Sequence, residues 1–584
     1  MTALGLIWRL ARFSPWHYLA MGTLVLLAGY LFPLVPGLVV REILNTLTGR
    51  AAAGWNVQSL LALLAAVGLA QAVASVASGV AESSLQVVVN TLLRRNMLER
   101  VLDRPGAQAL PSSSGEAISR FRNDVQQVSG YVIWTADPVG QLLTFVFGLT
   151  VLARIDPALT LVVLAVLLAV VVLTSLAVGR LEAYRKANQE AIGEVTGLLG
   201  ELFGAVLAVK VAGAEQRVVE HLRTINERGR RAGVRDQVFT NFFLGVPQNA
   251  ANVGAGLLLL AGAETMQGGR LTVGDFALFV SYLGTLAQAM SWVGVYLTQY
   301  RQMLVSLDRA QTMMQGSPPE QLVRHAPLHL RHGPPALPDL APTDGDRIER
   351  LEARHLSYRY PDSGRGITGI DLVLERGTFT VITGRVGAGK TTLLRVLLGL
   401  LPRAYGEILW NGHSVEDPGT FLVPSRVAYT PQAPRLFSES LRNNVLMGLP
   451  DRDGRLERAM RAAVLERDLA SLGQGLDTLV GPRGTKLSGG QLQRAGAARM
   501  LVREPELLVV DDLSSALDFE TELELWERLT KQRSATILAV SHRPVALRRA
   551  NQIVVLVDGR VMDRGRLEEL LERCEDMRRL WESS

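Results

Sequence analysis

Long uncharged apolar runs are confined to the first half of the chain, and the second half has none. Six of these runs approach the length of about 20 residues that an α-helix needs to cross a bilayer core of ~30 Å. The predicted spans are Tyr18–Val40, Val57–Ala81, Tyr131–Ala153, Ala158–Gly179, Phe242–Ala263 and Phe276–Leu297. The pattern therefore predicts an α-helical region of six membrane spans over residues 1–314.

The segments between the spans predict how the chain is oriented. Two of them, at about 82–130 and 180–240, are long, basic and periodic at three-to-four residue spacing, which is typical of helices. The remaining connections are short. Because basic loops stay in the cytoplasm, we expect both long segments there, and with six spans both termini as well. The expected location is the cell membrane, the inner or cytoplasmic one, with the second half of the chain in the cytoplasm.

A proline-rich stretch separates the two halves. Seven prolines fall between Gly316 and Arg347, which predicts a solvated linker over residues 315–348 and a second domain over 349–584. The linker also holds His325, His329 and His332, but no cysteine or carboxylate pattern nearby supports a metal site.

Composition narrows the class of protein. A single cysteine, Cys574, excludes an internal disulfide framework. The net charge of +6 is spread over both halves instead of forming a basic tail. With six spans in the chain, this distribution argues against a nucleic-acid-binding protein.

A phosphate-binding loop is the clearest motif of the second half. The short β-type run Phe379–Thr383 precedes it, and an apolar helical run follows it. The loop residues are Gly384, Arg385, Val386, Gly387, Ala388, Gly389, Lys390, Thr391 and Thr392. Glycines at this spacing let backbone N–H groups surround phosphate oxygens, with Lys390 reaching the phosphates and the Thr391 hydroxyl placed for Mg²⁺.

A second apolar run ends in two carboxylates. Leu507–Val510 has the pattern of a buried parallel strand, and Asp511 and Asp512 follow it. Asp511 is predicted to hold Mg²⁺, and Asp512 stands where a base for the attacking water is expected. Gln432 and Leu487–Gln491 lie between the two motifs. Ser515–Asp518 and then His542 come after them.

In this order and spacing, the motifs resemble those of ATP-binding cassette (ABC) transporters, in particular the exporter type in which a membrane domain and a cassette share one chain. The resemblance covers essentially the whole length. It implies an α-helical six-span membrane domain followed by an α/β P-loop NTPase domain, with ATP and Mg²⁺ as cofactors. It also implies a dimer with a second half-transporter, because two cassettes of this family enclose two ATP molecules.

The resemblance further implies roles for single residues. Tyr360 corresponds to the aromatic residue that stacks on adenine. Gln432 corresponds to the residue near Mg²⁺ and the attacking water, and His542 to the histidine at the γ-phosphate. Ser488, Gly489, Gly490 and Gln491 correspond to the signature loop that contacts the nucleotide of the opposite cassette. In the membrane half, segments at Gly115–Arg120, Val209–Glu215 and Leu271–Phe276 resemble the intracellular loops whose coupling helices contact the cassettes.

Two residues depart from the family pattern. Asp512 stands where the family usually has glutamate, and its side chain is shorter by roughly 1.5 Å, which disfavours contact with the attacking water and predicts slow or absent hydrolysis. Pro482 stands in a segment where the family's exporters tend to have glutamate. We slightly prefer a heterodimer, in which this chain owns the weak site and completes a strong one, to a homodimer.

The expected function is ATP-driven transport by alternating access, most simply export of a hydrophobic or amphipathic substrate such as a drug, a lipid or a peptide-like molecule. The alternatives are an ATP-binding regulatory half of a heterodimer, and a siderophore-type importer or lipid flippase on the same scaffold. Asp137 is the one acidic residue in the predicted spans. Its place near the cytoplasmic end of the third span favours a solvated or helix-capping role over a functional one.

Overall fold

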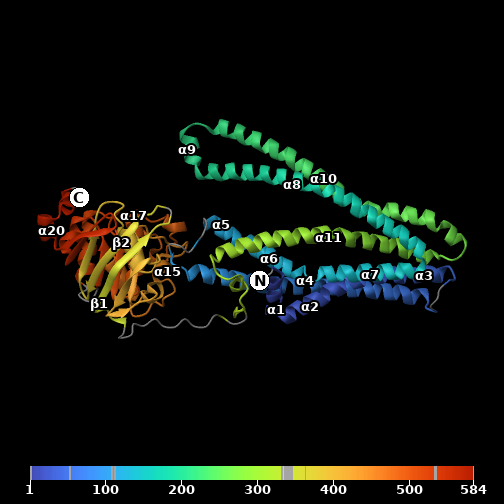
Figure 1. Ribbon diagram of the computed structural model, residues 1–584, viewed down its shortest axis with the longest axis horizontal. Helices are drawn as coiled ribbons and strands as arrows, with labels where there is room; N and C mark the ends of the chain where they lie inside the picture. The colour runs from blue at the N-terminus through green and yellow to red at the C-terminus, as the bar shows by residue number, and fades with distance from the viewer. Residues whose placement is uncertain are drawn as a thin grey trace. The chain divides into compact units, whose positions relative to one another are not determined.

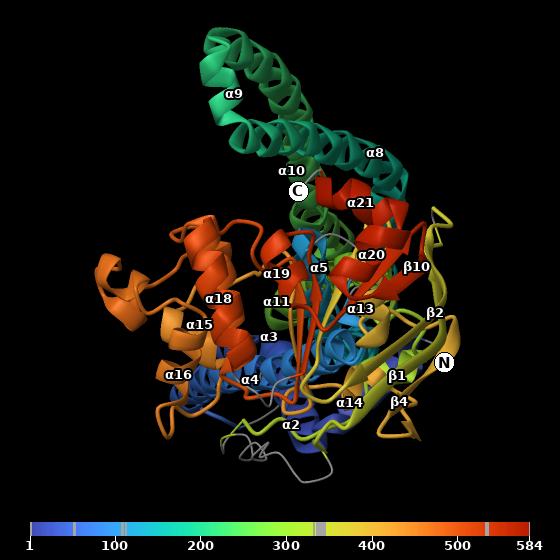
Figure 2. The same ribbon diagram turned by 90° about the vertical axis from the view of Figure 1, so that its left-hand side faces the viewer.

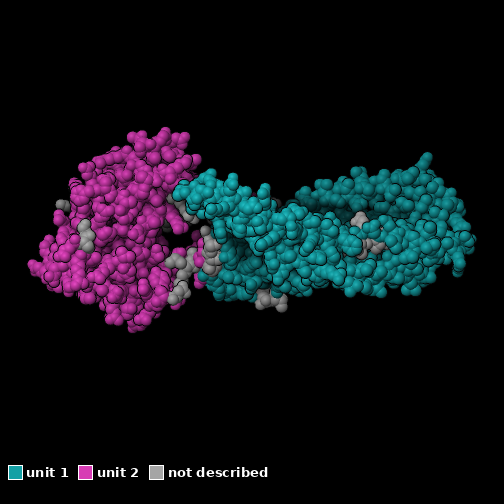
Figure 3. Space-filling model, turned by 90° about the horizontal axis from the view of Figure 1, so that it is seen from above, with its two compact units in different colours: residues 1–100, 111–328 teal, residues 101–110, 329–584 magenta. Residues whose placement is uncertain are grey.

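The computed structural model of the chain describes residues 3–50, 54–106, 110, 114–330, 333, 346–361, 363–531 and 536–582. It divides into two compact units, which Figure 3 colours separately. Unit 1 comprises residues 1–100 and 111–328, and unit 2 comprises residues 101–110 and 329–584. His332 of the predicted linker lies outside the described residues.

Unit 1 is entirely helical in its described part (Figure 1). Its elements are α1 (Ala3–Phe13), α2 (Pro15–Val25), η1 (Leu26–Leu31), η2 (Phe32–Leu34), α3 (Val35–Leu47), α4 (Val57–Leu102), α5 (Ser114–Ser119), η4 (Arg120–Asp124), α6 (Val125–Ile133), α7 (Asp137–Ile155), α8 (Pro157–Gly204), α9 (Val206–Val211), α10 (Glu215–Gln267), α11 (Val273–Met313) and α12 (Pro319–Leu322).

Within the described residues, five helical stretches are long and apolar enough to cross a membrane. They are Pro15–Leu47, Val57–Leu102, Gly115–Ile155, Pro157–Gly204 and Val273–Met313, and each contains one of the six predicted spans. The remaining predicted span, Phe242–Ala263, lies inside the 53-residue helix α10, which is not among the five. The number of six spans stays a prediction.

The first stretch is helical throughout but changes its winding. A π-helical turn, η1, leads into a 3₁₀ turn, η2, before the α-helix resumes at Val35. Pro33 lies in the 3₁₀ turn and has no N–H to donate, which favours an interruption of the α-helical hydrogen bonding there. The Tyr282 hydroxyl of α11 donates a hydrogen bond to the backbone oxygen of Leu34 at 3.0 Å, where the winding changes.

The segment before α11 corrects one expectation. Thr272 and Asp275 form a capping box at the start of α11, and Arg41 of α3 pairs with the buried Asp275 at 2.6 Å. The segment Leu271–Phe276 therefore lies beside α3, at the end of unit 1 where α8 begins and α10 ends. Because α9 lies at the other end of α8, the proposed likeness of Leu271–Phe276 to an intracellular coupling loop is wrong.

Helices α8 and α10 form a long hairpin with the short helix α9 at its turn, extending away from the other helices of unit 1 (Figures 1 and 2). α9 contains no buried residue in unit 1. The side chains of Leu207 and Val211 are 77% and 82% exposed, as is Phe203 before them at 77%. An apolar hairpin tip of this kind is typical of a surface that binds a partner.

The first part of the predicted linker is bound to unit 1. Asn96 of α4 donates hydrogen bonds to the backbone oxygens of Leu322 and Arg324, both at 2.9 Å. The Arg324 guanidinium contacts both carboxylate oxygens of Glu99, and a His325 ring nitrogen lies 2.9 Å from the backbone oxygen of Arg9. Leu322 and Val323 are buried, so the expectation of a solvated linker is wrong for these two residues, whereas Arg324 and His325 are bound to unit 1 but exposed.

Unit 2 is an α/β domain. Its elements are β1 (Arg350–Arg359), β2 (Gly366–Glu375), β3 (Phe379–Thr383), α13 (Lys390–Leu397), β4 (Tyr405–Trp410), β5 (His413–Ser414), α14 (Pro418–Phe421), β6 (Val427–Thr430), α15 (Leu441–Leu446), α16 (Arg455–Ala462), η6 (Asp468–Ser471), η7 (Gly475–Asp477), η8 (Pro482–Gly484), α17 (Gly489–Leu501), β7 (Leu507–Asp511), α18 (Phe519–Lys531), β8 (Thr536–Val540), α19 (Pro544–Arg549), β9 (Gln552–Val557), β10 (Arg560–Gly565), α20 (Leu567–Arg573) and α21 (Glu575–Glu582).

Two sheets organise unit 2. The larger one has the order β10-β9-β3-β8-β7-β6, with parallel pairing from β9 to β6 and β10 antiparallel at one edge. The smaller sheet, β2-β1-β4-β5, is antiparallel. Strands β3, β7 and β8 are buried along their whole length, which explains their unbroken apolar sequence. Because the paired strands are parallel, the residues that follow β3, β6, β7 and β8 lie along the same edge of the sheet.

Candidate nucleotide-binding site

The loop between β3 and α13 is built on glycines with positive φ. Gly384, Gly387 and Gly389 have φ values of 149°, 86° and 98°. A Cβ on Gly384 would lie 2.2 Å from the backbone oxygen of Leu556, so a side chain cannot fit at this position. The loop therefore keeps its backbone N–H groups clear of side chains and leads directly into α13, as a phosphate cradle requires.

Lys390 is the first residue of α13 and bends back over this loop. Its Nζ donates hydrogen bonds to the backbone oxygens of Gly384 at 2.7 Å and Arg385 at 2.9 Å. Burial lowers the pKa of Lys390, while the nearby carboxylates of Asp511 and Asp512 oppose that shift. The ammonium is thus held where anionic oxygens above the loop can replace the two backbone oxygens.

Asp511 ends strand β7 and faces the start of α13. Burial raises its pKa, and a hydrogen bond from Thr391 together with the charge of Arg395 partly offsets that effect. The same burial raises the pKa of the neighbouring Tyr429 to about 12. A buried carboxylate beside a threonine hydroxyl fits a hard divalent cation, which favours oxygen ligands and would stabilise the ionised acid.

Asp512, the next residue, differs from Asp511 in its backbone conformation and in the contacts of its side chain. Its φ of 52° lies in the left-handed region, and the side chain is only 8% exposed. Its Oδ2 accepts a hydrogen bond from Gln432 Nε2 at 3.2 Å, while its buried Oδ1 has no partner among the described residues. A buried acceptor without a partner costs free energy, and such sites are typical of functional positions.

Gln493 of α17 connects two loops around these groups and was not predicted from the sequence. Its side chain is buried, and its Nε2 donates to the Ser515 hydroxyl at 2.6 Å and lies 3.5 Å from the backbone oxygen of Gln432. Its Oε1 accepts from the N–H of Ala516 at 3.0 Å. Gln493 therefore fixes the segment after Asp512 relative to Gln432. Helix α17 also carries Gln491, Arg494 and Arg499, so no sequence signal singles out Gln493.

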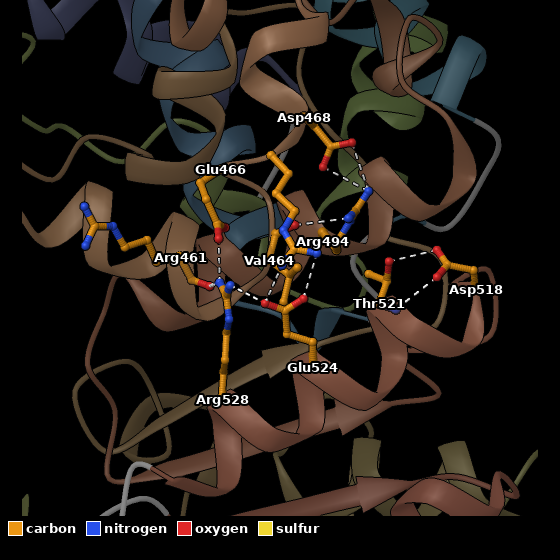
Figure 4. Close-up of polar contacts among 10 residues, drawn as sticks. Arg461, Val464, Glu466, Asp468, Arg494, Asp518, Thr521, Glu524 and Arg528 are labelled. Carbon is orange, nitrogen blue, oxygen red and sulfur yellow. Dashed lines mark hydrogen bonds and ion pairs between the residues drawn. The ribbon is translucent and has the colours of Figure 1, made fainter.

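The signature residues start helix α17. Ser488 caps the helix, and its side chain and that of Gln491 form a reciprocal capping box. Asp468 accepts a hydrogen bond from Gln491 at 3.0 Å. It also pairs with Arg494 at 2.9 Å (Figure 4). Arg494 also donates to the backbone oxygen of Val464 at 3.0 Å. The Asp468–Arg494 pair, which the sequence did not reveal, thus anchors the first turns of α17.

Three further motif residues have different surroundings. The Tyr360 hydroxyl lies 3.5 Å from the hydroxyl of Thr392, so Tyr360 stands next to the phosphate-binding loop. His542 follows β8 and is exposed. Asp518 caps α18 through the backbone N–H and hydroxyl of Thr521 at 2.9 and 2.8 Å, and these bonds lower its pKa (Figure 4).

The predicted signature residues, Ser488–Gln491, are not joined to the phosphate-binding loop within the described part of this chain. Among the described residues, no hydrogen bond or ion pair joins Ser488–Gln491 to the phosphate-binding loop. Ser488 and Gly489 are exposed at the N-terminus of α17. The phosphate-binding loop and the signature are therefore two separate surfaces of unit 2.

Comparison with known families assigns both units. Residues 19–290 match the family model described as the ABC transporter transmembrane region. Residues 367–515 match the model described as ABC transporter. The chain belongs to the ABC transporters.

Similar ABC proteins span most of the chain. A Staphylococcus aureus protein (strain NCTC 8325), named for multidrug export with ATP-binding and permease functions, is 28% identical over 479 residues, which cover 79% of this chain and 78% of the relative. Its counterpart in strain COL has the same identity and coverage. A solved bacterial Atm1-family ABC exporter with ATP bound superimposes with a TM-score of 0.72 at 20% identity, covering 98% of both chains.

These matches confirm the fold class and the general activity expected from the sequence. The chain is a multi-pass membrane protein of the ABC exporter type, with an ABC ATPase domain that binds ATP and drives transport. It carries one membrane domain and one cassette, so it is a half-transporter, and dimerisation is implied.

Proposed function

We propose that this ABC half-transporter exports a hydrophobic or amphipathic substrate, with Mg-ATP held at the phosphate-binding loop and hydrolysed slowly through Asp512. The similarity to proteins named for multidrug export supports the direction of transport. The observation that carries hydrolysis through Asp512 is its buried Oδ1, which has no partner in the described part of the chain and belongs to a carboxylate held by Gln432.

The described side chains fit Mg-ATP. Gly384–Thr392 would hold the phosphates, with Lys390 as the cation. Thr391, Asp511 and Gln432 would hold Mg²⁺. The positive charge of this ion would offset the negative charge of the phosphates. Tyr360 would contact adenine and His542 the terminal phosphate. Ser488, Gly489, Gly490 and Gln491 would contact the nucleotide of a second cassette, which agrees with the exposure of Ser488 and Gly489 at the start of α17.

Asp512 is the base in this proposal. Oδ2 is held by Gln432, which leaves Oδ1 to accept a proton from water. Aspartate reaches roughly 1.5 Å less far than glutamate, and general-base catalysis requires hydrogen-bond distance to the water. The cassette should therefore hydrolyse ATP more slowly than a cassette with glutamate at this position.

The membrane arrangement follows from the same proposal. The basic extensions of α8 and α10, and with them unit 2, lie in the cytoplasm by the positive-inside rule. The exposed α9 would contact the cassette of the second half-transporter. A second candidate function is that of an ATP-binding regulatory half of a heterodimer. The presence of Asp512 instead of glutamate is the observation that favours it.

The decisive experiment is the steady-state Mg-ATPase activity of the chain purified alone in nanodiscs, with Lys390→Ala as the blank. Activity above the blank supports a homodimer that hydrolyses ATP. ATP binding without activity contradicts hydrolysis through Asp512 in a homodimer and supports the heterodimer, whose partner is then sought among co-purifying chains.

The same assay tests whether the short side chain of Asp512 limits the rate of ATP hydrolysis. Asp512→Glu should raise the rate about tenfold, because the longer side chain reaches the water, and Asp512→Asn should reduce it to the blank. Asp477→Glu, an exposed aspartate of the same unit, is the control and should leave the rate unchanged. An unchanged or lower rate in Asp512→Glu would show that the length of this acid does not limit turnover.

A further inference from the structure

Unit 1 contains a polar cavity between η1, α4, α7 and α11. Its volume is about 510 Å³, the size of a site for a small organic molecule. Polar side chains from four helical segments line it, among them Tyr30, Glu82, Asp137, Gln141 and Gln288. A cavity with two carboxylates is unusual in a helical membrane domain, where acidic side chains are costly and tend to be functional.

In the part of the chain that the structure describes, Glu82 and Asp137 have no positively charged partner. Asp137 Oδ1 accepts a hydrogen bond from the Tyr30 hydroxyl at 2.6 Å, and Glu82 Oε1 accepts one from Ser78 at 2.7 Å. Within the described residues, neither acid forms an ion pair. Two carboxylates that line one cavity repel each other, and a cation between them removes that repulsion.

The position of Tyr30 is built into the backbone. Tyr30 lies in the π-helical turn η1, a type of turn found frequently at functional sites. Its ring lies against Gly140, where a Cβ would come within 2.2 Å of the ring carbon Cδ2. The glycine thus permits a close approach that brings the Tyr30 hydroxyl to Asp137, one helical turn earlier on α7. Asp137 is the first residue of α7, but the N-cap is Ala136 and no side-chain cap hydrogen bond is present, and Asp137 faces the cavity.

An apolar cavity of about 440 Å³ adjoins the polar one and shares Asp137, Gln141 and Trp292 with it. Its lining is aromatic and aliphatic, and the rings of Trp134 and Trp292 meet edge to face with centroids 5.6 Å apart. Aromatic faces attract organic cations and bury apolar groups. The acidic and the apolar region therefore meet at the side chains of Asp137 and Trp292.

The kind of cation follows from the lining. Among the described residues, no group of three or more His, Cys, Asp or Glu side chains could hold a metal ion. Two acids beside tryptophan rings instead match a cationic group carried on an apolar body. Such a ligand places its charge beside Glu82 and Asp137 and its apolar part against Trp134 and Trp292.

We propose that these two joined cavities form the substrate site of unit 1, and that the site selects amphipathic organic cations. This inference deepens the proposed function and rests on it, since it names the class of substrate that is exported. Glu82 and Asp137 determine the charge specificity, and Tyr30 is a positioning residue for Asp137.

The test is equilibrium binding to the full chain in nanodiscs without nucleotide. The probes are tetraphenylphosphonium, a permanent cation, and tetraphenylborate, an anion of the same shape. The wild-type chain should bind the cation at least tenfold more tightly than the anion. Glu82→Gln with Asp137→Asn should remove this preference, whereas Trp292→Ala should weaken the binding of both ions because it removes apolar contact.

Two further variants separate charge from folding. Asp137→Glu keeps the carboxylate and should retain the preference for the cation. Glu194→Gln removes an exposed carboxylate of α8 and should bind both ions as the wild type does. Equal binding of the two ions by the wild type, or an unchanged preference in the double variant, would overturn the proposal.

The outcome is distinguishable from failure of the proposed function. Lys390→Ala should bind the cation normally, because its substitution lies in unit 2, and should not transport it. A wild-type chain that hydrolyses ATP but does not prefer the cation would overturn the inference and leave the proposed function standing. A chain that prefers the cation but has no ATPase activity, even with co-purified partners, would refute the proposed function alone.

Discussion

The two units hold their functional groups in different ways. In unit 2 the groups follow the carboxyl ends of parallel strands, so the sheet places Lys390, Gln432, Asp511 and His542 along one edge. In unit 1 the polar groups are scattered over long helices, and they meet only because the helices approach each other at points such as Gly140. A site formed at strand ends can be predicted from short sequence motifs. A site formed by the packing of helices cannot, because its residues are far apart in the sequence.

The largest expected effect tests the helix contact that builds the cavity of unit 1. Gly140→Ala places a methyl group inside the ring of Tyr30 and should destabilise unit 1 by about 1–3 kcal/mol, the usual cost of overpacking. The measurement is unfolding of the purified protein in a mixed-micelle denaturant titration.

Gly79→Ala is the matched control for that variant. No atom lies within 4 Å of a Cβ built at Gly79, so the substitution should be neutral or slightly stabilising. Equal stability of the two alanine variants would show that Tyr30 does not depend on Gly140 for its position.

In unit 2 a strong effect should come from the anchor of the signature helix. Asp468→Ala removes the acceptor of Gln491 and leaves the largely buried Arg494 with only the backbone oxygen of Val464 as a partner among the described residues. We expect the ATPase rate to fall about tenfold, while binding of a fluorescent ATP analogue to the phosphate-binding loop stays unchanged. Asp451→Ala, which breaks a half-exposed pair with Arg442, is the control and should leave the rate as it is. A parallel loss of nucleotide binding would mean that Asp468 supports the whole unit and not α17 alone.

A smaller effect is expected at Asp511, the acid proposed to hold Mg²⁺, in the nucleotide-free protein. Burial raises the pKa of Asp511, so its ionised form destabilises the folded unit, and the penalty is absent well below the pKa of an unfolded aspartate. It develops as the pH rises through the folded pKa. Asp511→Asn should therefore raise the melting temperature of the nucleotide-free protein by a few degrees near neutral pH and by less in acid. A gain that does not shrink as the pH falls would exclude the carboxylate charge as its cause.

The smallest effect is expected where the chain leaves unit 1. Glu99→Gln removes the charge that Arg324 contacts, but both side chains are at least a third exposed. Such pairs contribute about 0.2–1 kcal/mol, and salt screens them. The stability difference should vanish at high salt. Asn96→Ala, which removes two buried hydrogen bonds to the same segment, should cost more and should keep its effect in salt.

The sequence predicted unit 2 well because its chemistry is local. The glycines, Lys390 and Thr391 are consecutive, and Asp511 and Asp512 directly follow a buried strand. It did not reveal Gln493, Asp468 or Arg494, whose partners lie more than 20 residues away along the chain. In unit 1 it found five of the apolar helices of the structure, since length and composition are enough for that.

The predictions for unit 1 were wrong where tertiary contacts determine the position of a segment. Leu271–Phe276 was assigned to the wrong end of the helices, because only the pairing of Arg41 with Asp275 shows where it lies. The bound state of residues 322–325 depends on Asn96, Glu99 and Arg9, which no local pattern connects to them. Asp137 was expected to act as a helix cap or a solvated acid. Its place in a polar cavity beside Tyr30 and Glu82 is visible only in the structure.

The length of the α8–α10 hairpin has a mechanical consequence. α8 has 48 residues, and at 1.5 Å per residue it is a rod of ~72 Å. A tilt of about 5° at one end of such a rod displaces the other end by about 6 Å, slightly more than the helical pitch of ~5.4 Å. The hairpin is therefore a lever, in which a rotation of a few degrees at one end of α8 displaces α9 sideways by about 6 Å.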